Sequence, residues 1–266
     1  MKKISAFIAV FLSTAILFAS GVKDPDSAPL VVGATSKPHA EMLKIISSDL
    51  ARHGIILEIV ESNDYDQLNA DVENGKLDAN FFQHIPYMQE VNKEKGFHLV
   101  NAGGIHIEPI ALYSKTLSSI KDLRIGATIA IANDTSNRTR SLLLLQSAGL
   151  IQLNPEATGN LTVSDITINF KSIKFLEIEA PFLVNALNDV DAVVITGNYA
   201  IAAGLSAGRD GIIVEQKNIP YINIVTVKEG SQNDPRIIAL IKALQSRKIR
   251  SFITEKYPSG EVIAAF

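Results

Sequence analysis

The sequence predicts an α/β fold built as two lobes, and three observations support this prediction. Segments with the composition of buried strands alternate with segments whose apolar residues have helical spacing. This alternation is typical of βαβ units, in which helices cover both faces of a largely parallel sheet. The rhythm restarts after Lys115, and 266 residues are enough for two moderate domains.

The first half of the chain contains strand-like and helix-like segments in alternation. The strand-like segments are short runs rich in Val, Ile, Leu and Phe, at 29–35, 55–62, 77–82, 97–103 and 108–114. The first helix is predicted from Glu41 to His53, because apolar residues recur at three- and four-residue intervals and Gly54 follows. Two more helices are predicted over 66–74 and from about Pro86 to Gly96.

The second half repeats this organisation. Its strand-like or extended segments are 124–133, 166–170, 173–179, 191–198 and 218–230. A buried helix is predicted at 141–150 and a shorter one at 181–187. One or two amphipathic helices over 235–253 close the chain.

The N-terminus has the features of an export signal. Lys2 and Lys3 precede an apolar run at 4–18, and small residues follow at 19–21. We therefore predict a signal peptide over 1–21 and a polar linker over 22–29. A transmembrane anchor is the alternative, but the run is shorter than the ~20 residues that span a bilayer.

The chain has no cysteine, which has two consequences. No disulfide can form, so stability must come from burial of the core. The stretch LFASG also resembles a bacterial lipoprotein signal, in which a lipid-bearing cysteine would follow the small residues. Here Ser20 is followed directly by Gly21, so lipid anchoring and release as a soluble protein both stay open.

Composition excludes some classes of function. A 47% share of hydrophobic residues and a 20% share of charged residues is typical of a soluble globular protein. The net charge of -3 and the absence of a basic run argue against nucleic-acid binding. No motif for a cofactor is present, and none is expected.

Polar and aromatic clusters mark the places where a ligand would bind. In open α/β sheets, ligands lie at the carboxyl ends of strands and near helix N-termini. Clusters in such positions are found at 62–67, 79–87, 132–140, 195–200 and 220–225.

The cluster at 132–140 predicts an anion receptor. Asp134 and its neighbours are good N-cap residues, so a helix should begin here. Asn137 and Arg140 then share one helical face. A guanidinium near the free N–H groups of a helix N-terminus can bind a carboxylate. The alternative is that Arg140 is a solvated surface arginine.

The cluster at 79–87 concentrates rings around Pro86, and three interpretations are considered. A metal site at His84 is not expected, because His39 and His106 are isolated in sequence and no metal-binding spacing is present. Ordinary core and the wall of a small-molecule pocket remain. Tyr65 occupies a comparable position between strand and helix.

Two amides complete the set of candidate site residues. Asn198 and Asn223 lie in otherwise apolar runs, and an amide can orient an ammonium or a carboxylate without adding charge. Capping of a local turn is the alternative.

Together these segments resemble the methionine-binding lipoproteins of bacterial ABC importers, the NlpA/MetQ family. The likeness extends through nearly all of the chain after the signal. It is carried by NDY, LDANFFQHIPY, NDTSNRTRSLLLLQSAGLI, VITGNYA and PYINIVTVKE, in that order.

The resemblance implies a periplasmic-binding-protein-like fold of type II, with a ligand cleft between two lobes and two crossover strands. The first lobe would comprise 30–110 and 227–266, because the closing helices return to it, and the second lobe would comprise 111–226. The crossovers are expected near 109–113 and 222–227.

The resemblance also implies a function without catalysis: capture of L-methionine and its delivery to a membrane permease. Arg140 and Asn137 would hold the ligand carboxylate, and Asn223 would fix the amino-acid backbone. The side chain would be surrounded by Tyr65, Phe82, His84 and Tyr87. Many relatives have Asn where this chain has Thr196, so Asn198 either replaces that contact or is structural.

Two other functions are considered. The first is a binding protein of the same fold for another amino acid. The second is an exported hydrolase that uses His84 with Asp64 or a serine, although the chain has no G-x-S-x-G motif.

Overall fold

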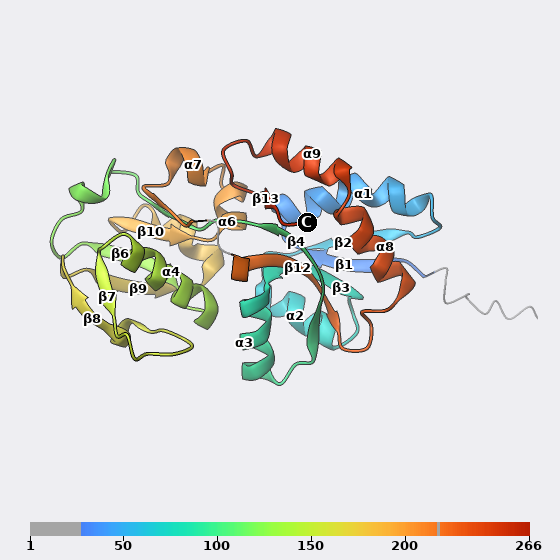
Figure 1. Ribbon diagram of the computed structural model, residues 1–266, viewed down its shortest axis with the longest axis horizontal. Helices are drawn as coiled ribbons and strands as arrows, with labels where there is room; N and C mark the ends of the chain where they lie inside the picture. Colours follow the sequence, from blue (N-terminus) through green and yellow to red (C-terminus); the bar gives the residue numbers. More distant parts are fainter. Residues whose placement is uncertain (1–27, 217–218) are drawn as a thin grey trace, which may run out of the picture.

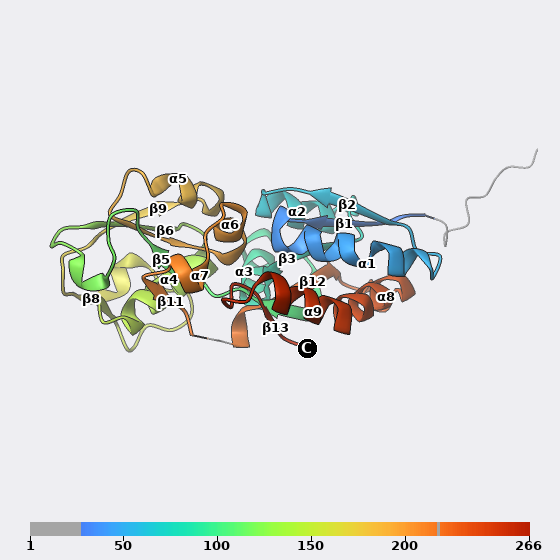
Figure 2. The ribbon, with the colours of Figure 1, turned by 90° about the horizontal axis from the view of Figure 1, so that it is seen from above.

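The computed structural model describes residues 28–216 and 219–266. Within these residues the chain forms two α/β lobes that lie side by side (Figures 1 and 2). The predicted signal peptide and most of the predicted linker lie outside the described residues. No helix of the described part is long and apolar enough to span a membrane.

The first lobe contains a six-stranded sheet in the order β13-β4-β12-β3-β1-β2. Its strands are β1 (Leu30–Ala34), β2 (Leu57–Glu61), β3 (Ala79–His84), β4 (Leu99–Ile107), β12 (Ile222–Lys228) and β13 (Ile263–Ala264). Its helices are α1 (Glu41–Ala51), α2 (Tyr65–Glu73), α3 (Ile85–Lys95), α8 (Pro235–Leu244) and α9 (Arg247–Lys256), with a π-helical turn η2 (Ser36–Ala40) before α1. Residues of α1, α8 and α9 share one core cluster, and residues of α2 and α3 share another.

The second lobe contains a five-stranded sheet in the order β11-β5-β10-β6-β9. Its strands are β5 (Ala111–Tyr113), β6 (Thr128–Ala132), β9 (Lys174–Ile178), β10 (Ala192–Ile195) and β11 (Ile213–Val214), and β7 (Ile151–Leu153) pairs separately with β8 (Ile166–Asn169). The helices are α4 (Thr135–Ser147), α5 (Leu183–Ala186), α6 (Gly197–Ala202) and α7 (Ala207–Asp210). Short 3-10 turns are η3 (Ile120–Asp122), η4 (Val163–Asp165), η5 (Ala180–Phe182) and η6 (Ile219–Tyr221).

Both sheets are mixed, whereas the sequence pattern predicts largely parallel ones. β1, β2 and β3 are parallel to one another, but β12 is antiparallel to both of its neighbours. In the second lobe, β5 runs antiparallel to β10. β13, near the end of the chain, is likewise antiparallel to β4.

The two lobes are joined by two crossovers. The first occupies 108–110, between β4 of one sheet and β5 of the other, at the start of the range expected for it. The second lies between β11 and β12. β12 hydrogen-bonds to β3 and β4 along its length, so residues 222–226, expected in the second lobe, belong to the first.

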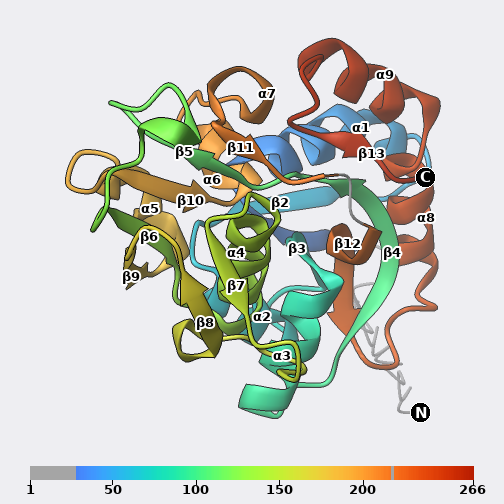
Figure 3. The same cartoon turned by 60° about the vertical axis from the view of Figure 1, so that its left-hand side comes forward.

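Several element boundaries differ from the predicted ones. The strand predicted at 191–198 ends at Ile195, because Gly197 begins helix α6. The helix predicted at 141–150 begins at Thr135, where Asp134 caps it, and the closing segment is two helices packed on the first lobe, as expected. Figure 3 shows α3 of the first lobe beside α4 of the second.

Candidate functional site

The residues predicted from sequence to bind a ligand all line one cavity between the lobes. These are Tyr65, Phe82, His84, Tyr87, Asn137, Arg140, Asn198 and Asn223. Gln83, Glu108, Thr196 and Gly197 complete the lining. The space in this cavity that is open to a water-sized sphere is about 20 Å³, room for about one water molecule, so the lobes are packed closely on each other here.

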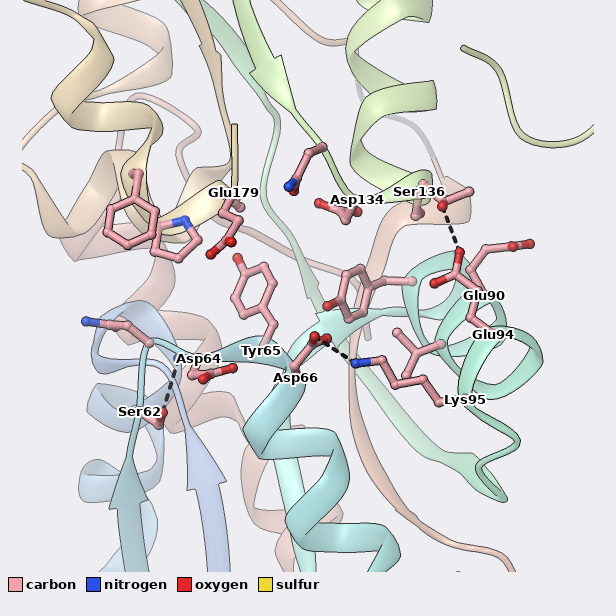
Figure 4. Close-up of a pocket in the computed structure, with 18 residues that line it drawn as sticks. Ser62, Asp64, Tyr65, Asp66, Glu90, Glu94, Lys95, Asp134, Ser136 and Glu179 are labelled. Atoms are coloured by element: carbon pink, nitrogen blue, oxygen red, sulfur yellow. Dashed lines mark hydrogen bonds and ion pairs between the residues drawn. The ribbon is translucent and has the colours of Figure 1, made fainter. Parts of the chain in front are cut away.

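A wider groove of about 770 Å³ adjoins the cavity and shares Tyr65 and Tyr87 with it (Figure 4). Helices α2 and α3 line it from the first lobe, and the start of α4 lines it from the second. Its lining includes six carboxylates, those of Asp64, Asp66, Glu90, Glu94, Asp134 and Glu179. Lys95 is the one cation in that lining, and it is paired with Asp66 at 2.7 Å.

Three helices begin at this place, which explains why the clusters between strand and helix converge. The side chain of Asp64 accepts from the main-chain N–H of Gln67 and starts α2. His84 starts α3 by accepting from the N–H of Tyr87, and Asp134 starts α4. The first turn of each helix therefore places a side chain at the interface of the lobes.

Three rings form one wall of the cavity, and we call them the ring wall: Tyr65, Phe82 and Tyr87. The ring centroids of Tyr65 lie 4.8 Å from Phe82 and 5.5 Å from Tyr87. Phe82 and Tyr87 belong to the hydrophobic core of the first lobe as well. The rings therefore pack in the core on one side and line the cavity on the other, and their role as the wall of a small-molecule pocket stays a prediction.

Strand alternation separates the two consecutive phenylalanines. Phe82 lines the cavity, whereas Phe81 is fully buried in the core on the opposite face of β3 and meets His39 edge-on at 4.6 Å. Gln83 also has its partners in the lobe, since its side chain bonds to those of Asn69, Asn80 and Thr226.

Arg140 is buried, with 3% of its surface exposed, so the surface alternative is wrong. Its Nε donates to Oε1 of Glu215 at 2.8 Å, and its Nη2 donates to Oε2 of Glu215 and to the main-chain oxygen of Glu108. The guanidinium also lies 4.2 Å from the ring centroid of Tyr221. The predicted anion receptor therefore already holds a carboxylate of this chain, on one edge of its fork.

His84 and Asn137 join the lobes directly. Nδ1 of His84 accepts from Tyr87, so Nε2 carries the proton and donates to Oδ1 of Asn137 at 3.2 Å. The amide nitrogen of Asn137 donates to Asp134. Burial, with the nearby charge of Arg140, lowers the pKa of His84 to about 3, so its ring is neutral.

Asn198 forms a second link between the lobes, and part of its side chain is left without a partner. Its Oδ1 accepts from the hydroxyl of Tyr65 at 2.7 Å. Its Nδ2 and the hydroxyl oxygen of Thr196 are buried without a hydrogen-bond partner among the described residues. Such groups are rare in proteins, and both residues line the cavity, so a polar ligand atom would satisfy them.

The fold also brings together His39 and His106, which the sequence analysis treats as isolated. With Glu108 they form a buried cluster: Oε1 of Glu108 lies 2.6 Å from Nε2 of His106 and 3.3 Å from Nε2 of His39. Burial lowers the pKa of His39 to about 4 and that of His106 to about 3, and raises that of Glu108 to about 7.

This cluster is the one group of potential metal ligands found in the described part of the chain. Two tetrahedral zinc ligands at ~2.0–2.1 Å from the metal lie about 3.3 Å apart. The 2.6 Å between Glu108 and His106 is shorter and is the length of a strong hydrogen bond. The geometry is therefore that of a hydrogen-bonded network.

Sequence reasoning missed Glu108, Glu215 and Tyr221. A carboxylate within the apolar run 105–113 was a signal for Glu108, since buried charges usually have a function. No local pattern marks Glu215, which lies 75 residues from Arg140 along the chain.

Two α/β lobes joined by two crossovers around a buried cavity define the fold of the periplasmic substrate-binding proteins. The chain belongs to the NlpA lipoprotein family, whose model matches residues 30–266. Solved relatives share its fold over about nine-tenths of the chain.

Three relatives illustrate this membership. The methionine-binding lipoprotein MetQ of Bacillus subtilis is 38% identical over 97% of both chains. A nutrient binding protein from Burkholderia cenocepacia, solved bound to methionine, has a TM-score of 0.86 and 41% identity, covering 89% of this chain and 100% of that one. A periplasmic substrate-binding protein of an ABC transporter from Coxiella burnetii has a TM-score of 0.84 and 38% identity, with the same coverage.

Proposed function

We propose that this chain is the extracytoplasmic solute-binding protein of an ABC importer and that it binds L-methionine between its lobes. The observation that carries this proposal is the composition of the cavity lining. A wall of rings occupies one side, and one guanidinium, one carboxylate and several amides occupy the other. This combination suits a small zwitterion with a neutral, polarisable side chain.

The ring wall accounts for the choice of side chain. A thioether gains about 0.3–1.5 kcal/mol from each contact with a ring edge. A charged side chain would be desolvated against these rings without a partner. The names of the Bacillus and Burkholderia relatives, both tied to methionine, support the same ligand.

The ligand backbone would lie against the polar residues. Arg140 and Asn137 would face its carboxylate, and Asn198 and Asn223 would fix its orientation. The lobes would open about the two crossovers to admit the ligand and close over it, as hinged binding proteins do. No bond in the ligand would be made or broken.

Delivery to a permease and attachment to a membrane belong to the same proposal. The predicted export signal supports a location outside the cytoplasm. The family name supports a lipid anchor, for which this sequence supplies no cysteine near Ser20 and Gly21.

The hydrolase alternative has no support in the geometry. Both ring nitrogens of His84 are engaged, by Tyr87 and Asn137, and Asp64 caps helix α2. No described contact joins His84 to Asp64 or to a serine.

A ligand panel tests the proposal. The protein is unfolded, dialysed and refolded to remove carried-over solute, and thermal shift and calorimetry are measured with L- and D-methionine, leucine, glutamine and histidine. L-Methionine should produce the largest shift. A shift no larger than that of leucine, glutamine or histidine would remove the methionine assignment and favour another amino acid.

A further inference from the structure

Glu108 is the one carboxylate among the residues that line the cavity, and it is 4% exposed. It follows β4 in the first crossover, so it lies between the lobes. Gly197 of the second lobe packs against it: a Cβ at Gly197 would lie 2.5 Å from Cβ of Glu108 and 2.9 Å from its Oε2. The carboxylate is therefore enclosed from both lobes.

The partners of this carboxylate are neutral donors. A carboxylate can only accept, so the Nε2 atoms of His39 and His106 carry protons toward it. Nδ1 of His39 accepts a hydrogen bond from the hydroxyl of Thr35 at 2.7 Å. Nδ1 of His106 has no partner among the described residues. Burial keeps the pKa of both imidazoles far below 6.5, so neither ring supplies a positive charge.

The proton on Nε2 of His39 also determines which atom of the Asn223 amide can bind the ligand. Nε2 of His39 lies 3.2 Å from Oδ1 of Asn223 as well as 3.3 Å from Glu108. Since Nε2 is a donor, Oδ1 of Asn223 is the acceptor, and its NH₂ group remains available as a donor. Asn223 is thus equipped to hold a carboxylate, and not an ammonium.

The positive charge of Arg140 does not serve Glu108 only, because Arg140 is also paired with Glu215. The bidentate bond to Glu215 occupies Nε and Nη2, and Nη2 also binds the main-chain oxygen of Glu108. These three side chains therefore bring two carboxyl groups to one guanidinium, and burial raises the pKa of Glu108 to about 7. A buried anion without its own cation is unfavourable, and a cation brought by a ligand relieves it.

We propose that Glu108 is the receptor for the ligand's ammonium group, and that this ammonium contributes more to affinity than the ligand's carboxylate does. The inference rests on the proposed function and specifies its ligand class: primary amines with an apolar, thioether-like side chain, in which a neutral amide can replace the carboxylate. The carboxylate adds less because it approaches a guanidinium that is already neutralised.

Three ligands on the unmodified, ligand-free protein test this at pH 7.0 by calorimetry. They are L-methionine, L-methioninamide and 4-(methylthio)butanoate, which lacks the amine. An α-amino group of pKa ~7.7–8.0 is mostly protonated at this pH. The amide should bind within about 10-fold of methionine, and the des-amino compound at least ~100-fold more weakly, as for loss of a partner of a buried charge. The reverse order overturns the inference.

A matched pair of variants adds a second measurement. Glu108→Gln keeps the size of the side chain. It should lower the affinity for methionine by at least ~30-fold and change the affinity for the des-amino compound by less than about 3-fold. Glu61→Gln removes an exposed carboxylate of the same lobe, paired with Lys44, and should change neither. Equal losses for both ligands in Glu108→Gln would overturn the assignment.

The two failures can be told apart. If the unmodified protein binds neither methionine nor its amide, the proposed function fails. If it binds methionine and the des-amino compound equally well, the proposed function survives and the role of Glu108 is overturned. The ligand series needs no variant, so poor folding of Glu108→Gln would leave this test intact.

Discussion

The hydroxyl of Tyr65 in the first lobe donates to Oδ1 of Asn198 in the second lobe at 2.7 Å. The same ring stacks on Tyr199 of the second lobe, with centroids 5.2 Å apart, and packs against Phe82 of its own lobe. One side chain thus belongs both to the ring wall and to the contact that holds the lobes together. Closure of the lobes therefore adds contacts from Asn198 and Tyr199 to one member of the ring wall.

Tyr65→Phe keeps the ring and removes the bond between the lobes. A typical hydrogen bond contributes about 0.5–1.5 kcal/mol, so methionine affinity should fall by roughly 2- to 12-fold in calorimetry. Tyr257→Phe is the matched control, since the Tyr257 hydroxyl binds Glu41 within the first lobe. Equal effects of both substitutions would contradict a specific role for Tyr65 in closure.

Phe82→Leu tests the ring wall with an apolar side chain that fills much of the same space. Loss of one contact between sulfur and a ring should weaken methionine by about 2- to 10-fold, from ~0.3–1.5 kcal/mol. Leucine, which has no sulfur, should lose less. Competition binding with the two ligands gives the ratio directly, and an unchanged ratio would show that Phe82 does not select the thioether.

The pair Arg140 and Glu215 should be strongly coupled in stability. Removing one partner of a buried ion pair leaves the other charge uncompensated and typically lowers the free energy of unfolding by about 3–5 kcal/mol. Arg140→Gln and Glu215→Gln should each have such an effect, and the double variant should lose clearly less than the sum. Urea unfolding of the ligand-free proteins measures all three, and additive losses would argue against the pair.

Stability should fall in mild acid because three histidines are buried in their neutral form. Burial lowers the pKa of His39 to about 4 and those of His84 and His106 to about 3, below the 6.5 of the unfolded chain. The unfolded state therefore binds more protons below pH 6.5, and the free energy of unfolding falls as pH drops from 6.5 toward 4.

Glu108 opposes this trend over part of the range. Burial raises its pKa from 4.5 to about 7, so the folded state takes up its proton first and gains stability as pH falls from 7 to 4.5. Between pH 6.5 and 5.5 the four groups together should lower the free energy of unfolding by about 2 kcal/mol. Urea titrations at both pH values measure this change. His98 is exposed, so the control variant His98→Gln should show the same decrease in the free energy of unfolding as the unmodified protein. A flat profile would contradict the neutral state of the three rings.

The order of strands and helices was predictable because apolar periodicity is a local property. The run 141–150 and the closing segment 235–253 both became helices near the expected positions. Helix starts were less accurate where apolar spacing alone was used: the helix predicted from spacing at 141–150 begins at Thr135, where the N-cap residues around Asp134 indicate a start.

The placement of β12 was not predictable in the same way. Its sequence reads as extended in either lobe, and hydrogen bonds to β3 and β4 decide that it belongs to the first. The backbone N–H and C=O groups that pair with a strand are the same in both sheets, so the sequence of β12 does not indicate which sheet it joins.

By itself, the sequence determined the α/β class and indicated eight of the twelve residues that line the cavity, since polar residues at strand ends and helix starts converge in such a fold. Only the tertiary structure decided the charges that these residues meet. Glu215 reaches Arg140 from 75 positions away, and Glu108 meets two histidines from separate strands and turns. Electrostatic energies depend on the distance between charges and on their burial, and the local sequence determines neither.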